Sequence, residues 1–253
     1  MAEQLNCQPV LLPGWGFDGS VFKDLAAILA GQYNRQVNIL DLPGYGSRKN
    51  VEIQAGLDAI VEPLIPLLNE NTTLVGWSMG GMAAIRIAAK LINKISSVIL
   101  LASTPCFVKK QDWPHGVERW QINRMSRQLQ SAAGTQNVLR DFSIITAMGD
   151  RSPRMTVDRL QRLLSTNNAN RQNLLQGLDV LGATDLREDV RQLTCRVVML
   201  LAENDRLVAT TTGAATKELL PSLILDYIPQ SGHAPFISEL HRTAALLNQY
   251  LDY

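Results

Sequence analysis

Residues 74–82 of the chain read LVGWSMGGM. They combine an apolar run, a turn that carries one serine, and the start of a helical pattern. The spacing Gly76-x-Ser78-x-Gly80 is typical of a nucleophilic serine on a tight strand-to-helix turn. Glycine is expected on both sides of the serine because the backbone passes too close there for a side chain. The following helix would point its free N–H groups at the serine and stabilise negative charge.

Composition limits the class of protein. The chain has 253 residues, of which 46% are hydrophobic, and a formal net charge of +1. This allows a large core and gives no reason to expect nucleic-acid binding. Neither a signal peptide nor an apolar run of about 18 residues occurs, so no membrane span is expected. Three cysteines without metal-type spacing suggest reduced thiols in a cytoplasmic protein: Cys7, Cys106 and Cys195.

Strand-like and helical patterns alternate through most of the chain. Strands are expected at 8–12, 36–40, 74–77, 97–102, 195–201 and 222–228. Helices are expected at 18–30, 53–68, after Ser78, at 212–220 and at 239–250. This alternation predicts a doubly wound, mostly parallel sheet, in which reactive groups gather beyond the carboxyl ends of the strands.

The middle of the chain breaks the alternation. No strand-like run occurs between Trp113 and Arg187, and helices are expected near 117–130, 137–148, 156–164 and 171–181. An all-helical block inside an α/β chain suggests a cap over an active site. We therefore expect a core formed by residues 1–108 and 188–253 and an inserted helical cap formed by residues 109–187.

The candidate serine needs partners, because a serine hydroxyl is a poor nucleophile without a base whose pKa lies near 7. His233 follows the last predicted strand in a glycine-containing loop and is the candidate base. His115 and His241 lie at the start of the cap and in the final helix, where a structural role is expected. The acid should follow the preceding strand, so Asp205 is the best candidate and Glu203 the second.

An oxyanion intermediate would need two backbone N–H donors. One is expected from Met79, the residue after the serine, and the other from Trp15 in the loop after the first strand. The Trp15 ring could also line an acyl pocket, although core packing would explain it equally well.

Several motifs are shared with a known family. Three are broad: residues 11–16 (LLPGWG), 41–46 (DLPGYG) and 76–81 (GWSMGG). Others are narrower: 103–107 (STPCF) with Trp-Pro at 113–114, 185–187 (DLR) and 233–238 (HAPFIS). Over nearly its whole length the chain resembles the α/β-hydrolase superfamily. Within that superfamily it is similar to the methyl ester esterases that act on pimeloyl-acyl-carrier protein in biotin biosynthesis.

The resemblance implies a Ser78–His233–Asp205 triad that needs no cofactor and no metal. It also implies substrate contacts from Trp15, Ser78, Met79, His233 and the segment Phe142, Ser143, Ile144, Ile145 and Thr146. Two features depart from the family pattern. Pro13 stands where the family has histidine, and the short segment before the first strand leaves no room for the full hairpin.

The predicted cap is basic. Residues 113–187 include ten arginines, no lysine and six acidic residues, a net charge of +4, which leaves −3 on the rest. Such a cap could dock an acidic carrier protein or its phosphopantetheine arm, with Arg151, Arg154 and Arg159 as candidates and Arg162 as a further one. A solvated surface with pairs such as Asp158 with Arg162 would explain the charge equally well.

The resemblance therefore implies a monomeric, cytoplasmic serine carboxylesterase. It would hydrolyse the methyl ester of pimeloyl-acyl-carrier protein through an acyl-enzyme and release methanol. Two alternatives stay open. One is a general short-chain esterase or a carbon–carbon bond hydrolase of the same fold, and the other is a non-catalytic ligand receptor built on that fold.

Overall fold

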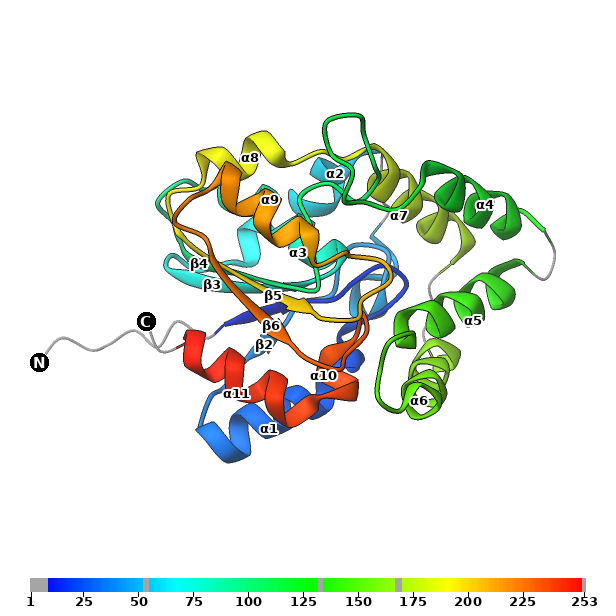
Figure 1. Ribbon diagram of the computed structural model, residues 1–253, viewed down its shortest axis with the longest axis horizontal. Helices are drawn as coiled ribbons and strands as arrows, with labels where there is room; N and C mark the ends of the chain where they lie inside the picture. Colours follow the sequence, from blue (N-terminus) through cyan, green and yellow to red (C-terminus); the bar gives the residue numbers. More distant parts are fainter. Residues whose placement is uncertain (1–8, 52–54, 132–133, 167–169, 252–253) are drawn as a thin grey trace, which may run out of the picture.

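The computed structural model describes residues 9–51, 55–131, 134–166 and 170–251. A six-stranded sheet, parallel at every pairing, forms its centre in the order β2-β1-β3-β4-β5-β6 (Figure 1). The strands are β1 (Val10–Leu12), β2 (Asn38–Ile39), β3 (Thr72–Trp77), β4 (Ile95–Leu101), β5 (Arg196–Ala202) and β6 (Ile224–Ile228). The predicted doubly wound parallel sheet is confirmed.

Helices cover both faces of the sheet. On one face lie α1 (Lys23–Tyr33) and α11 (Leu240–Leu251). The opposite face carries α2 (Leu57–Val61), α3 (Met79–Lys90), α8 (Arg187–Gln192) and α9 (Thr211–Leu219) (Figure 1). Both faces are covered, and the central strands are accordingly apolar and buried over their carboxyl-terminal halves, with polar residues confined to their first few positions.

Two of the predicted helices differ in the structure. The helix expected at 53–68 is only the short α2, followed by a 3-10 turn at Ile65–Leu67, because Pro63 and Pro66 interrupt its hydrogen bonding. Its first predicted residues, like Cys7 and Gln8, lie outside the described residues. The helix expected at 18–30 begins as a 3-10 turn, Gly19–Phe22, in which Asp18 accepts from the Ser20 N–H.

The helical insert lies between β4 and β5. Its helices are α4 (Arg119–Leu129), α5 (Gly134–Ala147), α6 (Pro153–Thr166) and α7 (Arg171–Ala183), which match the four predicted stretches to within a few residues. They lie to one side of the sheet in Figure 1, beyond the carboxyl ends of its strands. Their treatment as a cap domain with bounds 109–187 stays a prediction. Among the described residues, no helix is long and apolar enough to cross a membrane.

A neck joins the two ends of the insert, and we define it as residues 105–113 and 185–187. The Leu186 N–H donates to the Pro105 carbonyl over 2.8 Å, and Cys106 pairs with Asp185 in an antiparallel bridge. Arg187 forms an ion pair with Asp185 at 2.7 Å and lies over the Trp113 ring. The insert is therefore anchored where it leaves and rejoins the sheet.

Candidate active site

Ser78 occupies a strained turn between β3 and α3. Its backbone has φ 54° and ψ −120°, a conformation that costs a non-glycine residue about 1–3 kcal/mol. A Cβ on Gly76 would lie 2.3 Å from the Gly80 carbonyl oxygen, and one on Gly80 would lie 2.2 Å from the Leu12 oxygen. Both glycines are therefore required by close backbone packing, as the sequence predicts.

Three side chains from different strand ends form one hydrogen-bonded row. His233 Nε2 lies 2.9 Å from Ser78 Oγ, and His233 Nδ1 lies 2.7 Å from Asp205 Oδ2. The imidazole is fully buried, and Asp205 and Ser78 are 9% and 6% exposed. With Nδ1–H donating to the carboxylate, Nε2 is free to accept the serine proton. This arrangement can activate a hydroxyl for attack on a carbonyl carbon.

The loops after β5 and β6 hold the acid and the base in place. Asp205 Oδ1 accepts from the backbone N–H groups of Leu207, at 2.7 Å, and Val208, at 3.0 Å. The Trp77 indole N–H donates to the His233 carbonyl over 2.7 Å. The orientation of both side chains is thus fixed without any substrate.

The other candidate acids and bases have different contacts. Glu203 accepts from the Gln230 backbone N–H at 3.2 Å, so it supports the loop before His233 and does not contact the imidazole. His115 is half-buried, and its Nδ1 lies 3.0 Å from Thr211 Oγ1. His241 lies in α11.

The two predicted oxyanion donors lie on either side of the serine. Met79 is the first residue of α3, and the first N–H groups of a helix have no intrahelical acceptor. Trp15 follows β1 in a loop that touches the turn, since a Cβ on Gly14 would lie 3.1 Å from Ser78 Cβ. Ser103 Oγ donates to the Ser78 carbonyl over 2.7 Å and so stabilises the turn. The oxyanion role of both N–H groups stays a prediction.

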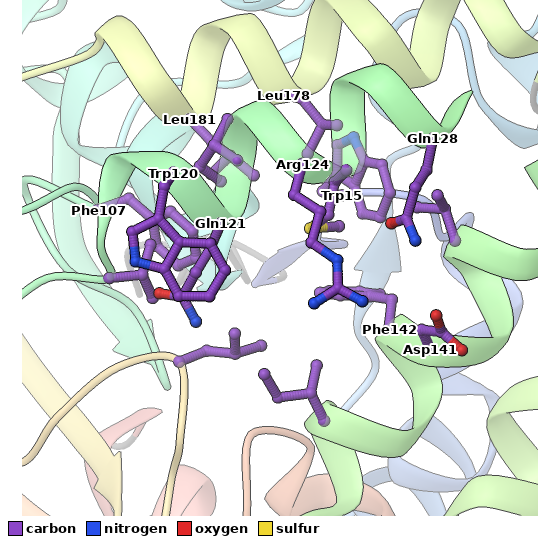
Figure 2. A pocket seen from close by; sticks show the side chains of 16 residues that line it. Trp15, Phe107, Trp120, Gln121, Arg124, Gln128, Asp141, Phe142, Leu178 and Leu181 are labelled. Atoms are coloured by element: carbon purple, nitrogen blue, oxygen red, sulfur yellow. The ribbon is translucent and has the colours of Figure 1, made fainter. Parts of the chain in front are cut away.

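A mostly apolar cavity of about 190 Å³ opens between α4, α5 and α7 (Figure 2). The Trp15 ring meets Phe142 edge to face, with centroids 4.9 Å apart, and its indole N–H donates to the Leu174 carbonyl. Figure 2 places Trp120 and Arg124 of α4 opposite Asp141 of α5, and all three are exposed, so they mark the mouth. The remaining walls are mainly aliphatic: Val117, Ile122, Met125, Val138, Ile145, Leu178, Leu181 and Leu207.

Comparison with known proteins identifies the family. The model of the alpha/beta hydrolase family matches residues 10–246. The chain belongs to this family. It is 32% identical over 243 residues to a pimeloyl-acyl-carrier-protein methyl ester esterase of Stenotrophomonas maltophilia, covering 96% of this chain and 92% of that protein.

A longer protein and a solved structure are also similar to this chain. A biotin biosynthesis bifunctional protein, BioHC, of Teredinibacter turnerae is 31% identical over 98% of this chain, which spans only 46% of that longer protein. A bromoperoxidase structure from Bacillus anthracis shares the fold, with a TM-score of 0.85 at 20% identity over 97% of this chain and 92% of that one. By family and by its relatives, the protein is a carboxylic ester hydrolase.

Only part of the predicted substrate segment faces the cavity of this hydrolase. Phe142 and Ile145 line it, because residues three apart share one face of α5. Ile144 is 46% exposed and is not among the residues that line it, so its role as a substrate contact stays a prediction. Ser143 and Thr146 are buried and do not line the cavity. The Ser143 hydroxyl donates to the Arg140 carbonyl, and the Thr146 carbonyl accepts from the His233 backbone N–H.

The cavity stops short of the serine. It reaches Trp15 and Leu207, but Ser78, Met79 and His233 are not among its lining residues. Leu207 is two residues from Asp205 and donates its N–H to that carboxylate. The cavity therefore ends close to Asp205, and Trp15 forms part of its wall.

The candidate docking arginines differ in their contacts. Arg159 forms an ion pair with Asp24 of α1 at 2.5 Å, and Arg151 binds the Gln230 side chain. Within the described chain, Arg154 is exposed and has no hydrogen bond or ion pair. No ion pair joins Asp158 to Arg162 there either, so the expected intrahelical pair is not formed.

The described thiols are free. Burial raises the pKa of Cys106 to about 11 and also raises the pKa of Cys195. Among the described residues, no group of three or more His, Cys, Asp or Glu side chains is arranged to hold a metal ion.

The α7 wall of the cavity was not predicted, although the sequence carries a signal for it. Gly177 interrupts the helical pattern, and a Cβ there would lie 2.5 Å from Trp15 Cδ1. A glycine within a predicted helix indicates close approach of another group, here the indole. Ser103 belongs to the 103–107 motif, but its hydrogen bond to the Ser78 carbonyl depends on the tertiary fold and has no signal in the sequence.

Proposed function

We propose that this hydrolase cleaves the methyl ester of a pimeloyl group carried on acyl carrier protein. The observation that carries the catalytic half of the proposal is the buried row of Ser78, His233 and Asp205 beside an apolar cavity. The substrate half rests on the relative from S. maltophilia and on the basic character of the insert.

The reaction begins when Ser78 Oγ attacks the ester carbonyl while His233 Nε2 takes its proton. Asp205 orients the imidazole and stabilises its charged form. The N–H groups of Met79 and Trp15 hold the oxyanion. His233 then returns the proton to the leaving oxygen, and methanol departs from the acyl-enzyme. A water molecule deprotonated by His233 releases the free carboxylate and restores Ser78.

In this proposal the acyl chain occupies the apolar cavity. Each buried methylene contributes about 0.8 kcal/mol, so a chain of several methylenes would be held by Trp15, Phe142 and Ile145. Its carrier-linked end would leave through the mouth beside Trp120 and Arg124. The carrier, an acidic partner, would be attracted to the net positive insert, and Arg154 is the most available docking residue because Arg151 and Arg159 already have partners.

The two alternatives make different predictions. A general short-chain esterase would turn over a small soluble ester and the carrier-bound ester with similar dependence on Arg154. A non-catalytic receptor would bind ligand without turnover, so multiple turnovers on a simple ester and covalent labelling of Ser78 by a fluorophosphonate would exclude it.

Complementation tests the proposal in a cell. A biotin-requiring bacterial strain that lacks its own esterase is supplied with the wild-type chain or with Ser78→Ala. We expect growth without biotin for the wild type and none for the variant, because loss of the nucleophile costs on the order of 10⁴ to 10⁶ in rate. If both proteins were expressed and the strain supplied with the wild type still failed to grow without biotin, the proposed substrate would be contradicted.

A further inference from the structure

Asp150 is a buried carboxylate that lies outside the proposed triad. It follows α5 in the turn to α6 and is 9% exposed. Its Oδ1 accepts the backbone N–H of Gly232 over 2.5 Å, and Gly232 immediately precedes His233. Its buried Oδ2 has no hydrogen-bond partner in the described part of the chain. Burying a carboxylate that has only one hydrogen-bond partner costs folding free energy. Its position beside the candidate base therefore suggests a functional role.

The turn around Asp150 contacts the same loop at several points. We call residues 146–151 the α5–α6 link. The His233 N–H donates to the Thr146 carbonyl over 2.9 Å, and the Arg151 N–H donates to the Gln230 carbonyl over 3.2 Å. The loop from Gln230 to His233 is therefore held by backbone bonds at both ends and by the Asp150 carboxylate between them.

The link also contacts the loop of the acid. The Asn204 side-chain amide donates to the Gly149 carbonyl over 3.0 Å, and Asn204 immediately precedes Asp205. Gly149 has φ 99°, and a Cβ there would lie 2.3 Å from the Asn204 oxygen. The loops that carry Asp205 and His233 are thus both hydrogen-bonded to one short segment of the insert.

The fit at Gly232 leaves little freedom. A Cβ at this position would lie 2.7 Å from the Met148 oxygen, 2.8 Å from the Thr146 oxygen and 3.1 Å from Asp150 Oδ1. Three acceptor oxygens of the link therefore surround one backbone unit of the histidine loop. A charged acceptor makes a stronger hydrogen bond to an N–H than a neutral one does, so Asp150 is suited to fix this unit.

We propose that Asp150 is a positioning residue that holds Gly232, and through it His233, in register with Ser78. The inference rests on the proposed serine-esterase function. Because the link joins α5 to α6, the position of the His233 imidazole would then depend on the position of the insert. A shift of the imidazole by about 1 Å would cost on the order of 10²-fold in rate.

The test compares variants on a small soluble ester, which needs no docking surface. Asp150→Ala removes the acceptor, Asp150→Asn keeps an acceptor oxygen of the same size, and Asp179→Ala removes an exposed aspartate of α7 as the matched control. We expect kcat to fall roughly 10- to 100-fold in Asp150→Ala, with KM changed less than about three-fold. Asp150→Asn should keep most of the activity, and Asp179→Ala all of it.

Two further readouts separate positioning from folding. Thermal unfolding shows whether each variant is native, and the rate of Ser78 labelling by a fluorophosphonate reports the base directly. If Asp150→Ala does not fold, Asp150→Ser, which shortens the acceptor, is expected to show the same fall in kcat. A natively folded Asp150→Ala or Asp150→Ser with wild-type kcat would overturn the inference. Activity that survives in Ser78→Ala would instead overturn the proposed function.

Discussion

At the scale of single residues, the site depends on positions where no side chain is tolerated. Ser78 adopts a strained backbone conformation because β3 and α3 hold it there, and the surrounding glycines let the chain pass. The hydroxyl is thereby presented to His233 without the movement of any other group.

The elbow glycine offers a direct stability test. Gly76→Ala should lower the free energy of unfolding by about 1–3 kcal/mol or more, because its Cβ would overlap the Gly80 backbone. Gly31→Ala is the matched control, since within the described residues no atom other than those of its chain neighbours and its own helix backbone lies within 4 Å of a Cβ at that position of α1. It should raise the free energy of unfolding by about 0.5–1 kcal/mol. Urea denaturation measures both, and equal effects of the two changes would contradict the packing described for the elbow.

Residue-level prediction worked where chain order and strand ends constrain a position. Ser78, Asp205 and His233 each follow a strand of a parallel sheet, so their meeting could be anticipated. The direction in which a side chain leaves its helix could not be predicted from the sequence. Ile145 lines the cavity whereas its neighbour Ile144 is exposed and does not, and only the packing of α5 sets that difference.

At the scale of elements, the neck fixes the insert to the sheet through charge. Hydrogen bonds from Arg187 and Lys110 hold the pKa of Asp185 well below its usual range. Arg187 also pairs with Asp112 at 2.8 Å and lies 5.6 Å from the Trp113 ring centroid. Both ends of the insert thus share one small polar cluster.

The neck makes stability depend on pH in the acid range. Because the pKa of Asp185 is lower in the folded protein than in the unfolded chain, where it is about 3.9, its ionised form stabilises the fold above that value. This stabilisation is lost as the pH falls further, toward the folded pKa. Asp185→Asn should therefore be less stable than the wild type at pH 7 and should lose less stability below about pH 4. Thermal unfolding of both proteins across this pH range measures the difference. If their stabilities changed with pH in parallel, Asp185 would not have this role in the neck.

Elements were predictable where their patterns are long. The four helices of the insert are amphipathic over several turns and were anticipated. The helix expected at 53–68 failed because prolines at 63 and 66 outweighed its apolar periodicity. Helices α8 and α10 (Pro235–Ser238) span too few residues to show a period and were not anticipated.

At the scale of the whole molecule, charge is divided unevenly between the insert and the sheet. The net positive insert carries Arg154 exposed on α6, near the start of that helix. Its attraction for an acidic carrier acts over about 10 Å at moderate salt and weakens as salt is added. This division was visible in the sequence, whereas the intramolecular partners of Arg151 and Arg159 depend on the tertiary fold.

Reversal of one charge tests docking. Arg154→Glu should lower kcat/KM for the carrier-bound ester about 3- to 10-fold and leave a small soluble ester unaffected, because only the former meets this surface. Arg242→Glu, the same change at an exposed arginine of α11 outside the insert, is the control and should have a smaller effect on the carrier-bound ester. Equal loss on both esters would show that Arg154 acts on folding or on the site itself.

The proposed function requires that Ser78 hydrolyses a carrier-bound methyl ester. The most direct measurement incubates the purified protein with pimeloyl-acyl-carrier protein methyl ester and follows the intact carrier by mass spectrometry. We predict that the wild type converts the ester to the free acid over many turnovers, with methanol as coproduct, and that Ser78→Ala converts on the order of 10⁴-fold less. An unchanged carrier mass with the wild type, or equal conversion by Ser78→Ala, would contradict the account.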